Sequence, residues 1–346
     1  MNIGIAGAGL VGRVLALMLL RQGHHLTLFD SDTPEGENAA GLTAAGMLAP
    51  FAELETAESA IFDSGQRSIQ LWPALLAQVG LDDATGAFQY KGSIITAHPA
   101  DEAELESFIR QLRTKVPAAE DIETLNQARL AELEPDLSHH KKGFFLPAEG
   151  QVNAQAFMAA SAEYLLSHPN VTWYSQVAVK AVSSGLIVAD KAFEFDWAFD
   201  SRGLGAKPEM SDLRGVRGEV FWLDAPEVNL TRPVRLMHPR YRIYIVPRPN
   251  HRYVVGATEI ESEDKSPMSV RSSLELLSAV YSVHSGFGEA RIVKQLTNCR
   301  PALKDNLPRV DVAKGIARVN GLYRHGYLLS PAMAEKAIQQ SFKESI

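Results

Sequence analysis

The chain has 346 residues, of which 46% are hydrophobic and 22% charged, a composition typical of a globular protein of about two domains. Its net charge of −7, from 34 Lys and Arg against 41 Asp and Glu, argues against nucleic-acid binding. The single cysteine, Cys299, excludes an intrachain disulfide. No apolar stretch reaches the roughly 18 residues of a membrane span, and a strand at residue 2 leaves no room for a signal peptide. We therefore expect a cytoplasmic protein that binds neither nucleic acid nor membrane.

The first residues predict a strand that turns into a helix at a ligand site. An apolar run over residues 2–6 leads into GAGLVG, in which Gly7, Gly9 and Gly12 have the GxGxxG spacing. Gly7 allows the tight turn, Gly9 lets a pyrophosphate approach the backbone, and Gly12 lets the helix lie close to the sheet. The alternative is a glycine turn without a ligand.

The next residues complete a dinucleotide-binding pattern. A helix is expected over residues 10–21, and a second strand over 26–29 ends at the carboxylate Asp30. Asp30 comes about 23 residues after Gly7, in the window of the acid that accepts a hydrogen bond from a ribose hydroxyl. Strand, glycines, helix, strand and acid therefore occur in the required order.

The rest of the chain alternates helical and strand-like segments. Residues 31–41 have the composition of a loop. Residues 88–97 have the pattern of a pair of strands. Strand patterns also fill residues 171–203 and 214–258. Amphipathic helices are expected at about 60–79, 101–116, 153–168 and 269–283, and after a glycine-bounded turn in residues 320–342.

Several stretches together resemble the flavin-dependent D-amino-acid oxidase family, and within it the glycine oxidases of thiamine biosynthesis. The dinucleotide pattern is shared with many enzymes, but the other stretches are more specific and cover the chain from end to end. They are GLTAAGMLAP (41–50), RGVRGEV (214–220), RPVRLMHPRYRIYIVPR (232–248), VVGATEIES (254–262), CRPALKDNLPRV (299–310) and NGLYRHGYLLSPA (320–332).

The resemblance implies a bound FAD. The pyrophosphate of FAD would lie against the glycine turn. The ribose of its adenosine would contact Asp30, and its adenine would contact the backbone of Val177. The AGM stretch would lie along the flavin ring, and N–H groups of the C-terminal turn would face the pyrimidine edge of that ring. The cofactor-binding residues implied are Gly7, Gly9, Leu10, Val11, Gly12, Asp30, Ala44, Ala45, Gly46, Met47, Val177, Arg324, His325, Gly326, Tyr327, Leu328 and Leu329.

The resemblance also implies a substrate carboxylate bound by Arg300, with the Tyr244 phenol as a second contact. Arginine suits this role because its planar fork donates two parallel hydrogen bonds and stays charged. Arg324 would contribute its backbone carbonyl to the substrate amine or its side chain to the carboxylate. Arg240, Arg242 and Arg248 flank Tyr244 and are rivals; in an alternating strand, Arg240 and Arg242 share its face.

Two features depart from the resemblance. His325 occupies a position in the flavin turn where other members can carry asparagine. Cys299 lies near the attachment cysteine of relatives with covalent flavin but is offset by about one residue, which favours non-covalent FAD.

The expected fold combines α/β and α+β parts. A discontinuous Rossmann-like FAD-binding domain would comprise residues 1–86, 148–215 and 296–346. A β-rich substrate-binding domain would comprise residues 87–147 and 216–295.

The expected activity is oxidation of glycine, with sarcosine or small D-amino acids as alternatives, to an imine and then glyoxylate while O2 is reduced to H2O2. A thiazole synthase is a possible partner, and a homo-oligomer is possible. An NAD-dependent dehydrogenase would share the glycine turn but not need the AGMLAP and HGYLLSPA stretches. A flavin-binding protein without turnover and an enzyme using another electron acceptor are the remaining alternatives. No metal is expected.

Overall fold

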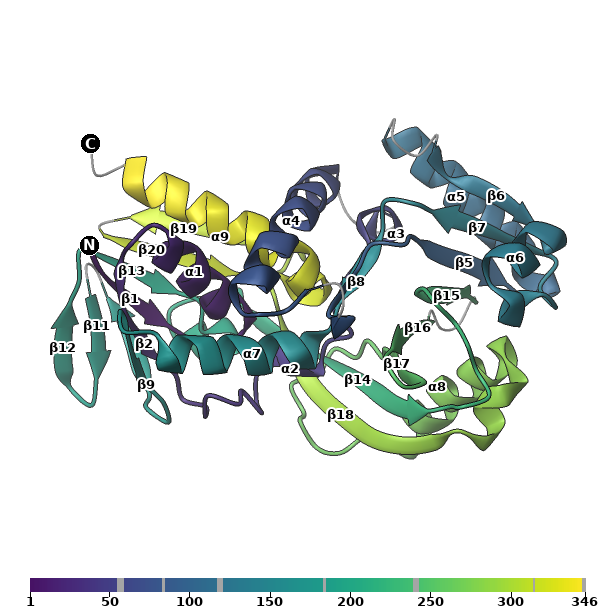
Figure 1. Ribbon diagram of the computed structural model, residues 1–346. Helices are drawn as coiled ribbons and strands as arrows, with labels where there is room; N and C mark the ends of the chain where they lie inside the picture. Colours follow the sequence, from purple (N-terminus) through teal and green to yellow (C-terminus); the bar gives the residue numbers. More distant parts are fainter. Residues whose placement is uncertain are drawn as a thin grey trace.

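Figure 1 shows the computed structural model of the protein, which describes residues 1–54, 59–82, 85–116, 121–182, 185–238, 243–313 and 315–343. One half is built on a six-stranded sheet in which all neighbouring strands are parallel except β19 and β20. Ile3 and Ile5 of its central strand are fully buried, as expected where both faces of a parallel sheet are covered. In spatial order the strands are β19 (Arg309–Ala313), β20 (Ile316–Asn320), β13 (Trp197–Asp200), β1 (Asn2–Ala6), β2 (His25–Phe29) and β9 (Val171–Tyr174).

A layer of four helices covers one face of this sheet (Figure 1): α1 (Leu10–Arg21), α4 (Ser59–Gln78), α7 (Ala154–Ser167) and α9 (Gly326–Lys343). Trp72 of α4 is fully buried where three of these helices meet. Its ring stacks on Tyr327 of α9 at 5.7 Å between centroids and meets Phe157 of α7 edge-on at 5.0 Å. Its indole N–H donates to the Tyr327 carbonyl at 2.9 Å. The tryptophan therefore fixes the start of α9 against the layer.

A small antiparallel sheet packs against the opposite face. Its strands are β10 (Val179–Val182), β11 (Gly185–Val188) and β12 (Lys191–Glu194). Leu186 and Phe193 from this sheet join Ala6 and Phe29 in one apolar cluster. In the described part of the chain both faces of the large sheet are thus covered, and a ligand is expected at the strand ends.

The other half contains an eight-stranded sheet that is antiparallel except between β15 and β5. Its longest ladder pairs β14 with β18 from Arg214 opposite Ala302 to Asp224 opposite Arg291. In spatial order the strands are β18 (Arg291–Ala302), β14 (Arg214–Asp224), β17 (Arg252–Gly256), β16 (Ile243–Arg248), β15 (Val234–Met237), β5 (Ser93–Ala97), β7 (Lys142–Leu146) and β6 (Glu123–Asn126).

Helices α8 (Val270–Val283), α5 (Glu102–Lys115) and α6 (Gln127–Leu133) pack on this sheet through two separate apolar clusters. Between the halves lie α2 (Ala40–Thr43), α3 (Pro50–Glu53) and a short sheet of β3 (Met47–Leu48), β8 (Gly150–Val152) and β4 (Phe88–Gln89), as Figure 1 shows. Short 3-10 helices are η2 (Pro99–Asp101), η4 (Pro135–Leu137), η5 (Gly203–Ala206), η6 (Ser285–Glu289) and η7 (Tyr323–His325).

The structure confirms the expected β1–α1–β2 unit, the expected amphipathic helices and the C-terminal turn and helix. The expectation that residues 88–97 form a strand pair is wrong in one respect. Both strands exist, but β4 pairs with β8 whereas β5 pairs with β7 and β15, because Gly92 turns the chain between two sheets. Strand β18 was not foreseen, since its first five residues are exposed and show no apolar alternation. No helix in the described part of the chain is long and apolar enough to cross a membrane.

His140 joins β5 to the end of α8 inside this half. Its ring nitrogens lie 3.2 Å from Thr96 Oγ1 and 3.3 Å from the Val283 carbonyl oxygen, and the residue is buried. Burial, followed by the neighbouring His139, lowers the pKa of His140 from 6.5 to about 4. The folded protein therefore holds this ring neutral at pH values where an unfolded chain protonates it.

This difference predicts a pH-dependent loss of stability. Between pH 6.5 and about 4 the unfolded chain binds a proton at His140 that the folded protein does not, so the free energy of unfolding falls as pH falls. We expect His140→Gln to make this fall shallower by up to about 1.4 kcal/mol per pH unit in urea titrations. His25→Gln, at an exposed histidine, serves as the control. Equal slopes in wild type and His140→Gln would contradict this account.

Candidate functional site

A cavity of about 1070 Å³ lies where the two large sheets meet. One wall follows the carboxyl ends of β1, β2 and β13, where ligands bind in open α/β sheets; the other comes from β14, β16 and β18. The cavity brings together residues from both ends of the chain. Of the residues expected to bind cofactor or substrate, it is lined by Gly7, Gly9, Leu10, Val11, Asp30, Ala44, Ala45, Gly46, Met47, Tyr244, Arg300, Arg324, His325, Gly326, Tyr327 and Leu328.

Three expected cofactor residues lie behind the cavity wall. A Cβ atom on Gly12 would overlap the carbonyl oxygen of Gly7, so this glycine serves close packing of α1. Leu329 is fully buried in the helix layer. Val177 donates its backbone N–H to the Asp30 carbonyl at 2.8 Å, while the next two residues line the cavity.

The other two glycines of the turn have different surroundings. Gly7 has a φ of +89°, and a Cβ there would lie 2.7 Å from the backbone of Arg202. A Cβ on Gly9 would meet no atom within 4 Å. Because Gly9 also lines the cavity, this open space is where a ligand can approach the backbone.

The N-terminus of α1 and the end of β2 complete the dinucleotide pattern. The α1 N-cap, Gly9, makes no side-chain cap hydrogen bond, and the first turn contains no acidic residue. Its free N–H groups and the helix dipole favour an anion such as a pyrophosphate. The Asp30 carboxylate accepts hydrogen bonds from the N–H groups of Ala8 and, at 2.8 Å, Asp32, which hold it at the cavity edge. These residues fit the adenosine and pyrophosphate parts of FAD.

The AGM stretch passes along the cavity in a conformation fixed from outside. Gly46 has a φ of +67°, and a Cβ there would overlap the Val152 carbonyl oxygen. Arg248 donates to the carbonyl oxygens of Ala45 at 2.5 Å and Val152 at 3.3 Å, and also to Gln151. Burial lowers the pKa of this guanidinium to about 10. Arg248, which the sequence offers as an alternative substrate-binding arginine, therefore uses its donors to hold the AGM stretch in place.

The C-terminal turn enters the cavity at η7 and continues into α9. Tyr327 is buried, and its hydroxyl lies 3.1 Å from the Gly41 carbonyl and 3.2 Å from the Ala154 carbonyl. This phenol thus ties α9 to α2 and α7, while the first turn of α9 faces the ligand space. No acidic residue lies in that turn. The arrangement is one that stabilises negative charge on a ligand.

Arg300 extends from β18 across the backbone of β14 at Gly218, where a Cβ would overlap the guanidinium. Nη1 and Nη2 both donate to the Thr258 carbonyl at 3.1 Å, and Nη1 also donates to the Arg217 carbonyl at 3.2 Å. Within the described ranges, no carboxylate lies within ion-pair distance of Arg300, and Nε has no hydrogen-bond partner. The edge formed by Nε and Nη2 is thus available for two parallel hydrogen bonds.

Tyr244 lies on β16 at the same cavity. Burial raises the pKa of its phenol above 10, although the Arg300 charge acts in the opposite direction. The phenol therefore remains protonated near neutral pH and can donate a hydrogen bond.

Arg324 has a different environment from Arg300. Its Nε lies 2.7 Å from Glu53 Oε2, and its Nη1 lies 3.2 Å from Glu259 Oε2. Glu53 also lies 3.2 Å from Arg235 and 3.3 Å from His325 Nδ1. Burial raises the pKa of Glu53, but Arg324, His325 and Arg235 together hold it well below its usual range. The Arg324 charge is thus already balanced.

Sequence reasoning missed Glu53 and Arg235, which also line the cavity. A signal existed, because Glu53 directly follows the apolar stretch AGMLAPFA with a carboxylate that must be exposed or paired. Cys299 is buried at the cavity wall, and its thiol contacts the carbonyl oxygens of Ser262 and Asp264 at 3.7 and 3.8 Å. Burial raises the pKa of this thiol. The remaining rivals, Arg240 and Arg242, lie outside the described residues.

Comparisons with known proteins give matches along nearly the whole chain. A family model described as FAD dependent oxidoreductase (DAO) matches residues 2–340. The "Putative thiamine biosynthesis oxidoreductase ThiO" of Rhizobium etli is 37% identical over 99% of this chain and 97% of its own length. The "Bifunctional protein ThiO/ThiG" of Trichormus variabilis is 27% identical over 96% of this chain, which covers 51% of that protein.

A glycine oxidase from Geobacillus kaustophilus is 26% identical over 95% of this chain and 90% of its own length. A crystal structure of glycine oxidase from the same organism has the same fold, with a TM-score of 0.83 over 99% of this chain and 94% of that one, at 24% identity. The glycine turn, the acid after β2 and the end-to-end match lead to one conclusion. This chain belongs to the DAO family of FAD dependent oxidoreductases.

Proposed function

We propose that the protein oxidises glycine, or a similarly small amino acid, to the imine, which hydrolyses to glyoxylate and ammonia. The observation that carries the proposal is the free Nε–Nη2 edge of Arg300 in the cavity. Arg202, Arg235 and Arg324 also line the cavity, but each lies against a carboxylate of the protein, and Arg271, which lines it too, is exposed on α8. Arg300 is therefore the arginine best suited to a substrate carboxylate.

In this proposal Arg300 and Tyr244 fix the substrate carboxylate, and the backbone carbonyl of Arg324 accepts from the substrate amine. FAD, when bound, would supply the acceptor for a hydride, that is one proton with two electrons, from the Cα–H bond; the amine loses one further proton to give the imine, and these two electrons and two protons reduce O2 to H2O2. The protein supplies binding, orientation and exclusion of water. The low pKa of Glu53 keeps it ionised, so it holds Arg324, Arg235 and His325 in place and does not serve as an acid.

The similarity to a ThiO and to ThiO/ThiG fusions supports a role in thiamine biosynthesis, with a thiazole synthase as partner. We propose that residues 1–86, 148–215 and 296–346 form the FAD-binding domain and that residues 87–147 and 216–295 form the substrate-binding domain. Non-covalent attachment of FAD is proposed because the buried Cys299 thiol is held against two carbonyl groups.

Flavin binding tests the cofactor site. The Cβ of a valine at Gly9 would meet no atom of the fold and would enter the open space at the glycine turn, so we expect Gly9→Val to be folded but to lack FAD. Gly9→Ala should retain part of the affinity. Asp30→Ala removes an acceptor for a ribose hydroxyl and should weaken binding by about 1 to 3 kcal/mol. Dissociation constants of the apoproteins for FAD measure these effects; a wild-type FAD content in Gly9→Val would contradict the assignment.

Substrate oxidation tests the activity itself. Mixing with glycine under anaerobic conditions should bleach the flavin absorbance, and in air glyoxylate and H2O2 should form in equal amounts. Rapid bleaching by bulky D-amino acids but not by glycine would favour a D-amino-acid oxidase. Absence of bleaching with glycine, sarcosine and D-amino acids would refute an amino-acid oxidase.

Arg300→Ala tests the carboxylate anchor. Loss of two charged hydrogen bonds in a partly buried site should cost about 3 to 5 kcal/mol of transition-state stabilisation. This corresponds to a fall in kcat/KM for glycine of roughly a hundred- to several-thousand-fold. Arg300→Lys should recover only part, because an ammonium lacks the planar fork. Arg291→Ala, at the exposed end of the same strand, is the matched control and should match wild type. Equal kcat/KM in Arg300→Ala and wild type would exclude Arg300 as the anchor.

A further inference from the structure

The segment after β17 runs beside β14 and contains Thr258, whose carbonyl accepts hydrogen bonds from Arg300. Arg217 and Ile260 form a hydrogen-bonded antiparallel pair, with N–H to carbonyl distances of 2.9 and 3.0 Å in the two directions. Two residues further along this register, Glu219 lies opposite Thr258, whereas the adjoining β14–β17 ladder places Val220 opposite Gly256, so one extra residue is accommodated on the β17 side between the two registers. An undistorted ladder would again exchange both backbone hydrogen bonds between this pair.

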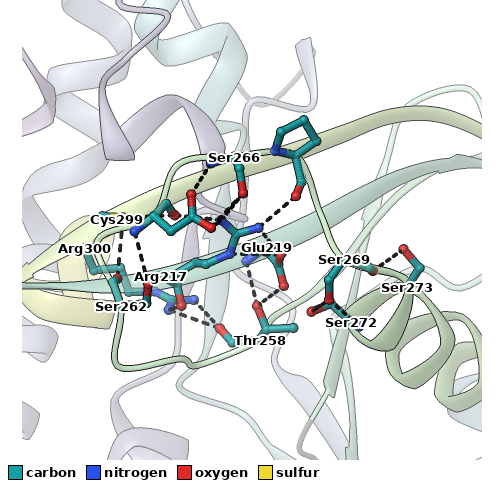
Figure 2. A network of polar contacts seen from close by, with 12 residues as sticks. Arg217, Glu219, Thr258, Ser262, Ser266, Ser269, Ser272, Ser273, Cys299 and Arg300 are labelled. Atoms are coloured by element: carbon teal, nitrogen blue, oxygen red, sulfur yellow. Dashed lines mark hydrogen bonds and ion pairs between the residues drawn. The ribbon is translucent and has the colours of Figure 1, made fainter.

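Only one of these two backbone bonds forms. The Thr258 N–H donates to the Glu219 carbonyl at 3.4 Å, as the ladder requires. The Glu219 N–H, however, donates to Thr258 Oγ1 at 3.0 Å. The Thr258 hydroxyl thus takes the place of the Thr258 carbonyl, which accepts both guanidinium hydrogen bonds from Arg300 (Figure 2).

A buried ion pair fixes the hydroxyl in this role. Thr258 Oγ1 donates its own proton to Glu219 Oε2 at 2.8 Å, which directs its lone pairs toward the Glu219 N–H. Glu219 is fully buried, and its Oε1 lies 2.6 Å from Nη2 of Arg217. The other terminal nitrogen of Arg217, Nη1, donates to the Asp264 carbonyl at 2.7 Å. Figure 2 shows these side chains converging on Thr258 from β14 and from the loop that follows β17.

We infer that Thr258 is a positioning residue for carboxylate binding, because its hydroxyl replaces its carbonyl in the ladder and frees that carbonyl to hold the outer edge of Arg300. Because the Thr258 carbonyl occupies the Nη1–Nη2 edge, the Nε–Nη2 edge of this cavity-lining residue is left to donate to a ligand. The inference rests on the proposed function in one respect, namely that Arg300 binds the substrate carboxylate.

Thr258→Val keeps the shape of the side chain but removes the acceptor, so the Glu219 N–H should recapture the Thr258 carbonyl and displace Arg300. We expect the dissociation constant of glycolate, which carries a carboxylate without an amine, to rise about tenfold, with a similar rise in KM for glycine. The rate of flavin reduction at saturating glycine should change less, and FAD affinity should be unchanged. Thr258→Ser retains the hydroxyl and should stay within about threefold of wild type.

A matched control is Thr231→Val. The Thr231 hydroxyl also donates to a fully buried glutamate, Glu134, that is paired with an arginine, but neither residue lines the cavity. This variant loses a comparable hydrogen bond and should bind glycolate as wild type does. The effect of Thr258→Val should also disappear in an Arg300→Ala background, since a positioning residue acts only through the group it positions.

Three results would overturn the inference: unchanged glycolate binding in Thr258→Val, an equal loss in the Arg300→Ala background, or a crystal structure of Thr258→Val with Arg300 still held by the Thr258 carbonyl. The crystal structure decides the positioning role independently of any activity. If wild type oxidises no glycine, the proposed function fails while this test stands.

Discussion

The antiparallel pairing of β14 with β18 is the constraint on which the substrate side of the molecule depends. Eleven register pairs carry these strands from the edge of the dinucleotide site into the second sheet. The pairing sets Arg300 opposite Val216, from where its side chain can cross β14 only because residue 218 is glycine. A shift of one residue in this register would move every side chain of β18 to the other face. The position of the guanidinium is therefore a property of the whole ladder.

Several arginines lie at or near the cavity, and they fall into two groups by the partners of their guanidinium groups. Arg202, Arg235 and Arg324 lie against carboxylates. Arg13 and Arg248 are buried and bonded to neutral acceptors, and within the described residues neither has a carboxylate at ion-pair distance. A buried cation without a counter-ion is costly, and burial lowers the pKa of both groups to about 10. Neither of these two lines the cavity; Arg300 and the ion-paired arginines do, and they favour an anionic ligand.

Local features of this protein could be predicted from the sequence, because they depend on neighbours in the chain. The glycine turn, Asp30 and the terminal helix belong to this class. The clustering of Arg300 with Tyr244 came from a resemblance, since an arginine before a proline has no local signature. Its rival Arg248 could be set aside only when its partners on the AGM stretch were visible.

Features that depend on distant pairing could not be predicted. The exposed half of β18 lacks an apolar pattern, yet β14 holds it in the sheet. Strand β4 pairs with β8 and not with its neighbour in sequence, β5. The exchange of hydroxyl for carbonyl at Thr258 follows from a register between segments that are some 40 residues apart. A single sequence without such contacts contains no sign of it.

The topology also sets an order of assembly during synthesis. The glycine turn precedes all eight strands of the second sheet in the chain, and η7 and α9 follow all of them. Until α9 packs against α1 and α4, the apolar residues of α1 that face α9 have no cover. This surface therefore stays exposed while the second sheet is made, and the cofactor cavity is complete only once η7 and the start of α9 have been added.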